Sequence, residues 1–137
     1  MPVSNPPQLT SLRVAAMHDA VEDTVEGTVR SFVEFDATDY NLVYADDVTL
    51  SFYDDEADMH EHFEEIHSYV HIDFTEIDFF TEELFPVSER VRYIATSFDV
   101  FTLLRVYFGD EGLFVALDVD EPVEPVVEAI EAVHDGD

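Results

Sequence analysis

The chain has 137 residues, and its 33 acidic residues against five Arg and no Lys give it a formal net charge of −28. The lack of Cys excludes disulfides, thiolate zinc sites and cysteine nucleophiles, and five scattered Arg cannot form the basic surface that binds nucleic-acid phosphates directly. Short apolar runs exclude a transmembrane helix and indicate no membrane partner, whereas 47% apolar content suffices for the core of one globular domain.

The first predicted element follows a proline-rich arm. Residues 1–8 contain three prolines and no hydrophobic periodicity, so we expect a flexible N-terminal arm and then a single globular domain over residues 9–137. Thr10 or Ser11 is suited to cap the first helix. The apolar stripe of this helix recurs at helical spacing and consists of Val14, Met17, Val21 and Val25.

A hairpin and a second helix are predicted next. Residues 29–47 contain two β-rich runs around a polar turn, which is typical of a hairpin. Residues 54–71 begin with three acidic residues, which favour a first helical turn, and their apolar stripe is formed by Met59, Phe63, Ile66 and Val70. Residues 72–85 fit both helical and alternating patterns, and we expect a short irregular stretch there.

The last third of the chain predicts strands and a final helix. Residues 90–108 are β-branched and aromatic but too long for one strand, so we expect a break near residues 97–99. The segment from Gly109 to Gly112 predicts a tight turn into residues 113–120. Residues 122–133 predict a helix with an inward face of Val123, Val126, Val127, Ile130 and Val133.

These elements predict an α+β domain: an antiparallel sheet of about five strands with helices packed on it, in the order helix-strand-strand-helix-strand-strand-strand-helix. The strand within residues 98–108 is apolar on both sides. One side has Val100, Leu104 and Val106, and the other has Phe101, Leu103 and Tyr107. Both faces of the sheet must therefore be covered, either by helices of the same chain or by a second copy.

Two resemblances follow from this order. The opening helix and the hairpins VRSFVEFDATDYNLVYADD and LLRVYFGDEGLFVALD resemble a haloarchaeal family of small acidic proteins, over about residues 12–133. The order and lengths of the elements also resemble the roadblock/LC7 domain. That second resemblance implies a dimer that scaffolds or regulates small GTPases or chemotaxis and motility machinery, and it implies no catalytic residues.

The charge also indicates the solvent. At about 1 M ionic strength the Debye length is roughly 3 Å, so surface carboxylates hardly repel one another. In dilute buffer the same repulsion opposes compact folding. We therefore expect a halophilic protein from a cell rich in KCl. We expect it to be cytoplasmic, because the N-terminal residues lack the basic and apolar regions of a signal peptide.

Four of the six His lie in the second predicted helix, and they are the first candidates for a chemical site. His60, His67 and His71 share one face with Glu64, which lies between them. The spacing of His67 and His71 is one by which helices hold zinc or nickel, although the chain has no HExxH motif. These four residues form a candidate metal site, and the alternative is a solvated polar stripe.

No other motif points to catalysis or to a cofactor. Clusters of carboxylates are expected among 33 acidic residues, and neither an EF-hand loop nor a nucleophile elbow is present. We therefore predict that the chain is not an enzyme. Arg90, Arg92 and Arg105 lie in the predicted sheet, and we expect them to form structural ion pairs, with an anion-binding cleft as the alternative.

The favoured function is an interaction or regulatory module that forms a homodimer and binds another protein. Its candidate interaction residues lie in the Phe-rich segment and the two-sided strand: Phe74, Ile77, Phe79, Phe80, Phe101, Leu103 and Tyr107. One alternative is a small metal-binding protein or metal-dependent enzyme that uses the His-rich helix. Another is an acidic mimic of DNA that occupies a nucleic-acid-binding protein.

Overall fold

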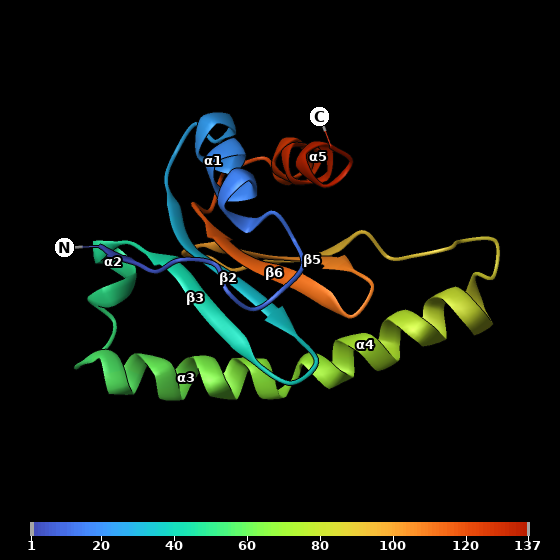
Figure 1. The fold of residues 1–137 in the computed structure, drawn as a ribbon, viewed down its shortest axis with the longest axis horizontal. Coiled ribbons are helices and arrows are strands. Elements are labelled where there is room, and N and C mark those ends of the chain that lie inside the picture. Colours follow the sequence, from blue (N-terminus) through green and yellow to red (C-terminus); the bar gives the residue numbers. More distant parts are fainter. Residues whose placement is uncertain (1, 137) are drawn as a thin grey trace.

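The computed structural model describes residues 2–136, in which six strands form one antiparallel sheet (Figure 1). The strands are β1 (Val3–Ser4), β2 (Val29–Asp36), β3 (Tyr40–Ala45), β4 (Tyr93–Ser97), β5 (Thr102–Phe108) and β6 (Glu111–Leu117). Their order across the sheet is β1-β3-β2-β6-β5-β4. The expected antiparallel α+β architecture is confirmed, and the strand beyond the expected five is β1.

Helices lie on both faces of the sheet (Figure 1). The helices are α1 (Val14–Thr24), α2 (Asp47–Leu50), α3 (Glu56–Ser68), α4 (Val70–Phe79) and α5 (Val123–His134), and a π-helical turn (Phe80–Leu84) continues α4. The first core lies under α1 and α5, and the second lies under α3 and α4. Helices of the same chain therefore cover both faces, which was one of the two arrangements left open by the sequence.

The two sides of β5 reach different cores. Leu104 and Val106 are fully buried in the first core, Tyr107 is buried in the second, and Leu103 is only partly buried there. The two-sided apolar pattern is thus explained within one chain. Cover on the α3 and α4 face is less complete: partly buried side chains such as Leu103 and Ile94 outnumber the buried ones in its cluster, whereas buried side chains are in the majority in the first core.

Residues 72–84 are helical, so the expected irregular stretch over residues 72–85 was wrong. The chain continues from α3 through a single break at Tyr69 into α4 and the π-helical turn. No Gly or Pro interrupts residues 70–85. The helical face that contacts the sheet contains Asp73 among apolar residues, and this carboxylate binds Arg105 of β5. A polar residue on the inward face had obscured the helical stripe.

The N-terminal segment also differs from expectation. Within residues 2–8, β1 pairs with β3, and the Asn5 side chain donates to the carbonyl of Leu42; Met1 lies outside the described residues. Helix α1 begins at Val14 without a side-chain cap. Thr10 does not cap it, because the cap position is Arg13; the backbone N–H and hydroxyl of Thr10 instead donate to Glu34 of β2.

The hairpin between β5 and β6 is confirmed. Phe108 pairs with Glu111, so the turn consists of two residues. Gly109 has a φ of 67°, a conformation that favours glycine at the first position of such a turn. Gly112 lies inside β6, where any side chain would collide with the Phe35 ring and the Val106 carbonyl.

Candidate interaction surface

Strand β4 forms an open edge of the sheet. It pairs with β5 on one side, and no strand within residues 2–136 pairs with its other side. The opposite edge differs, because β1 covers part of β3 there. An unpaired edge presents free backbone donors and acceptors to a further strand.

The sequence around this edge lacks the acidic character of the rest of the chain. Residues 90–109 contain three of the five Arg and a single carboxylate, Asp99. Strand β4 itself contains no charged residue, and the side chains of Ala95 and Ser97 are exposed. A protein with 33 acidic residues therefore has an uncharged strand at its open edge.

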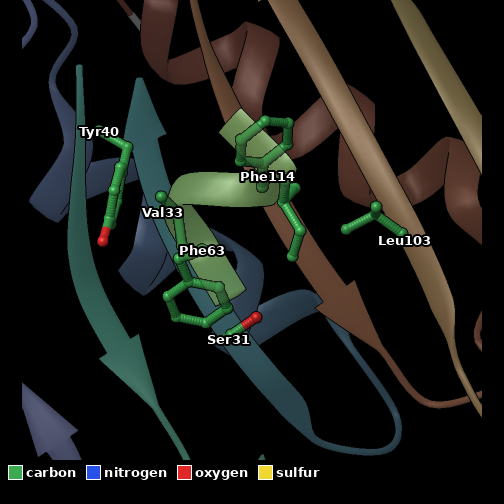
Figure 2. Close-up of a pocket in the computed structure, with 7 residues that line it drawn as sticks. Ser31, Val33, Tyr40, Phe63, Leu103 and Phe114 are labelled. Carbon is green, nitrogen blue, oxygen red and sulfur yellow. The ribbon is translucent and has the colours of Figure 1, made fainter. Parts of the chain in front are cut away.

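A small apolar hollow opens on the face of the sheet under α3 (Figure 2). Its volume is about 40 Å³, and its lining comes from four strands and α3: Ser31, Val33, Tyr40, Phe63, Ile66, Leu103 and Phe114. Figure 2 shows the Phe63 ring beside Val33 and Ser31, with Leu103 on the far side of Phe114. The lining crosses the sheet from Tyr40 on β3 to Leu103 on β5, the strand that pairs with β4.

A buried ion pair fixes α4 to the sheet. Arg105 Nη1 donates to Asp73 Oδ2 at 2.6 Å, and Arg105 Nη2 donates to Thr96 Oγ1 of β4 at 3.2 Å. The hydroxyl of Tyr107 donates to the same Asp73 oxygen. Burial and then the hydrogen bond to Asp73 raise the pKa of Tyr107, so this hydroxyl stays protonated. These contacts hold α4, β5 and β4 in one arrangement.

Apolar side chains are exposed where the chain leaves α4. Phe79 is 52% exposed, Leu84 and Phe85 are exposed to a similar degree, and Val87 is 90% exposed. The rings of Phe80 and Phe85 stack with centroids 5.9 Å apart. In Figure 1 the end of α4 extends past the hairpin between β5 and β6. Exposed apolar groups in such a cluster are typical of a contact surface.

The Arg residues form the expected structural ion pairs. Arg90 and Arg92 both donate to Glu131 of α5, each with one contact of 2.7 Å. The hydrogen bond from Arg92 lowers the pKa of Glu131. Burial acts in the opposite direction, and the positive charges of Arg92 and Arg90 add to the lowering. Arg30 binds Asp46 at 2.9 Å and Asp118 at 2.7 Å. These guanidinium groups already have carboxylate partners.

The seven candidate interaction residues do not lie in one patch. Phe74 and Tyr107 contact each other in the second core with ring centroids 5.6 Å apart, and Ile77 packs beside them. Phe101 stacks on Phe98 at the turn between β4 and β5. Of the remaining three, Phe79 and Phe80 lie at the end of α4, and Leu103 lines the hollow under α3.

The candidate metal ligands have separate partners. His60 Nδ1 lies 3.1 Å from the Tyr40 hydroxyl, and His67 Nε2 lies 2.8 Å from the Asp36 carbonyl oxygen. His71 Nδ1 contacts the carbonyl oxygen of Ser68 in its own helix. Within residues 2–136, no three His, Asp or Glu side chains come together in a way that could hold a metal ion. Of these three His residues, His60 contacts β3, His67 contacts the end of β2 and His71 contacts its own helix.

Two features of this surface were missed from the sequence. The open β4 edge has a signal, since residues 90–109 are poor in acid while the rest of the chain is rich in it. The contact between Asp73 and Arg105 has a weaker signal in the sequence. That signal is a single carboxylate on the inward face of α4, a helix that was not expected.

No helix among the described residues has the length and apolar character needed to cross a membrane.

The arrangement defines a class of fold: a single α+β domain whose antiparallel sheet lies between two helical layers. Such a fold is found in the solved structure of a Roadblock/LC7 domain from Streptomyces avermitilis, which matches with a TM-score of 0.57 over 90% of this chain and 92% of that chain. The two sequences are 14% identical, so the likeness establishes the fold. The roadblock-like fold expected from the sequence is thereby confirmed, although the number of strands and the order of elements differ slightly from the expectation. No protein-family model and no curated protein matches the chain.

Proposed function

We propose that this chain is a non-catalytic interaction module that forms a homodimer through the β4 edge and regulates or scaffolds another protein. The observation behind the proposal is the uncharged, unpaired strand β4 in a chain of net charge −28. Even in molar salt, carboxylates that meet inside a contact between two copies repel one another, because they come within contact distance and lose part of their hydration. Contact through residues 90–109 brings together the segment in which that repulsion is smallest.

The geometry around the edge suits a second copy. A twofold axis beside β4 would pair the two β4 strands and extend the sheet across both copies. The partly buried Ile94 and Leu103 lie on the α3 and α4 face near this edge, so the pairing would also cover apolar surface there. The roadblock/LC7 likeness supports the same proposal, because the resemblance implies a dimeric scaffold.

The dimer is tested by adding a charge to the edge. We expect light scattering coupled to size exclusion, in about 2 M KCl, to give the mass of a dimer for the native chain. Ala95→Glu places two new carboxylates against each other across the edge and should weaken the dimer at least about tenfold. Ala15→Glu makes the same change at an exposed position on α1 and should leave the dimer intact. A native monomer at every concentration, or an Ala95→Glu dimer as stable as the native one, contradicts the proposal.

We also propose that the module works in a cytoplasm rich in KCl. The net charge of −28 and the absence of Lys support this. The expected result is a native near-UV circular dichroism spectrum in molar KCl that is lost or reduced at about 0.1 M salt, where the Debye length grows to about 10 Å. A full native spectrum at the lower salt concentration would contradict halophilic stabilisation.

A further inference from the structure

An open groove lies between α4 and the hairpin of β5 and β6, separate from the hollow under α3. Its volume is about 570 Å³, and segments from the β2–β3 turn, from α4 and from the chain that enters β4 line it. The apolar part of the lining is formed by Phe74, Ile77, Val91 and Tyr107. Its size falls in the range of roughly 300–1,000 Å³ that is usual for binding clefts.

The polar groups of this apolar floor are already satisfied. The Tyr107 hydroxyl donates to Asp73, and the Tyr107 carbonyl accepts from Arg90 Nη1 at 3.1 Å. Arg90 is the positive residue that lines the groove, and its Nη2 donates to Glu131 at 2.7 Å. The floor therefore presents apolar surface to a ligand, and its guanidinium group is already held by a carboxylate.

The rim of the groove presents unpaired negative charge. Three exposed carboxylates line it, one from α4, one from the segment before β4 and one from the β5–β6 turn: Asp78, Glu89 and Asp110. None of these three has an ion-pair partner among the described residues. A ligand that fills this groove must therefore place apolar groups on its floor and positive charge at its rim.

We infer that this groove binds a basic amphipathic segment of another protein, with apolar side chains on the floor and Lys or Arg beside the three rim carboxylates. The inference rests on the proposed function as an interaction module and names the chemistry of its partner. A second copy of this chain fits poorly, because four of its five Arg residues are already paired with carboxylates, Arg13 donates to the Val133 carbonyl, and most of the ionisable residues of the chain are acidic. The acid-poor edge and the acid-rimmed groove thus select different partners.

The test uses a short fluorescein-labelled peptide of Leu and Lys, patterned as an amphipathic helix, in molar KCl. We expect saturable binding by fluorescence anisotropy. One control peptide replaces Lys by Glu, and another keeps Lys and replaces Leu by Ser. Both control peptides should bind at least about tenfold more weakly, because the first loses the ion pairs with the rim and the second loses the apolar face. Amide chemical shifts of labelled protein should change around residues 74–78, 89–91 and 107–110.

Two triple variants separate the groove from general charge attraction. Asp78→Asn, Glu89→Gln and Asp110→Asn remove the rim charges and should weaken peptide binding about tenfold, from three contact ion pairs. Asp19→Asn, Asp23→Asn and Glu128→Gln remove the same charge from exposed positions on α1 and α5 and should leave binding within about twofold of native.

The outcomes are distinguishable from those of the dimer test. Absence of binding, equal weakening by both triple variants, or shift changes away from the groove overturns the inference. A native dimer that fails to bind the peptide overturns this inference and leaves the proposed dimer standing. A monomer that binds the peptide in the groove supports this inference and contradicts the dimer.

Discussion

Replacing Asp73 by Ala is expected to lower the free energy of unfolding by about 3 kcal/mol, because it breaks a buried ion pair from one side. The carboxylate accepts from both Arg105 and Tyr107. Without it the Arg105 guanidinium keeps only the contact with Thr96, and its Nε is already buried without a partner among the described residues. The Tyr107 hydroxyl would then be buried without an acceptor, and the partly buried Arg105 guanidinium would lose its carboxylate partner.

Urea unfolding in molar KCl measures this loss, and Asp78→Ala is the matched control. Asp78 lies on the same helix but is exposed, so its removal should cost less than about 0.5 kcal/mol. The triple variant Asp73→Leu, Arg105→Met and Tyr107→Phe should recover most of the stability, since it removes the ion pair together with the buried Tyr107 hydroxyl that would otherwise lack an acceptor. If Asp73→Ala is no more destabilising than Asp78→Ala, the ion pair does not hold α4 on the sheet.

Elements with strong periodicity were predictable from the sequence. The last helix was expected over residues 122–133 and is observed as Val123–His134, with Val126, Val127, Ile130 and Val133 buried. The hairpins of β2 with β3 and of β5 with β6 were also located correctly. In each case the apolar spacing and the turn residues agree, so local and tertiary preferences point to one structure.

Elements that depend on distant contacts were not predictable in this way. The apolar face of helix α4 is continuous only if Asp73 is counted as one of its inward residues. The inward position of Asp73 becomes evident only in the folded protein, where Arg105 of β5 lies opposite it. Thr10 is a good helix cap by type, yet its contacts with Glu34 hold it over β2, three residues before the cap position at Arg13. The His residues share a helical face, but each is directed to its own neighbour by contacts that spacing does not encode.

Glu34 is the second residue whose replacement should have a large effect. It is 0% exposed on β2 and accepts from the backbone N–H groups of Gln8 and Thr10 at 2.8 Å and from Leu9 at 3.2 Å. It also accepts from the Thr10 hydroxyl and from the Asn41 side chain. Glu34→Gln puts an amide donor against these donors and should lower the free energy of unfolding by about 3 kcal/mol.

The control for Glu34 is Glu111→Gln. Glu111 binds the backbone N–H and hydroxyl of Ser11 in a similar way, but these contacts are exposed. Its replacement should cost less than about 1 kcal/mol. Hydrogen exchange of residues 8–10 should accelerate in Glu34→Gln, because these amides lose their acceptor. Equal costs for the two variants would show that burial adds nothing to the Glu34 contacts.

The Glu34 contribution also depends on pH in a direction that can be worked out. Burial pushes the pKa of Glu34 up, but the hydrogen bonds from Asn41, Thr10 and Gln8 outweigh it and hold the pKa below the ordinary 4.5. The unfolded chain therefore binds the proton more readily than the folded chain just below that value, and stability rises with pH there. The stability difference between the native chain and Glu34→Gln should be constant above about pH 5 and should shrink as the pH falls below about 4.5.

A difference that stays constant down to pH values well below 4.5 would mean that Glu34 is not held as a carboxylate by the N-terminal segment. In that case residues 8–10 would not be fixed over the sheet.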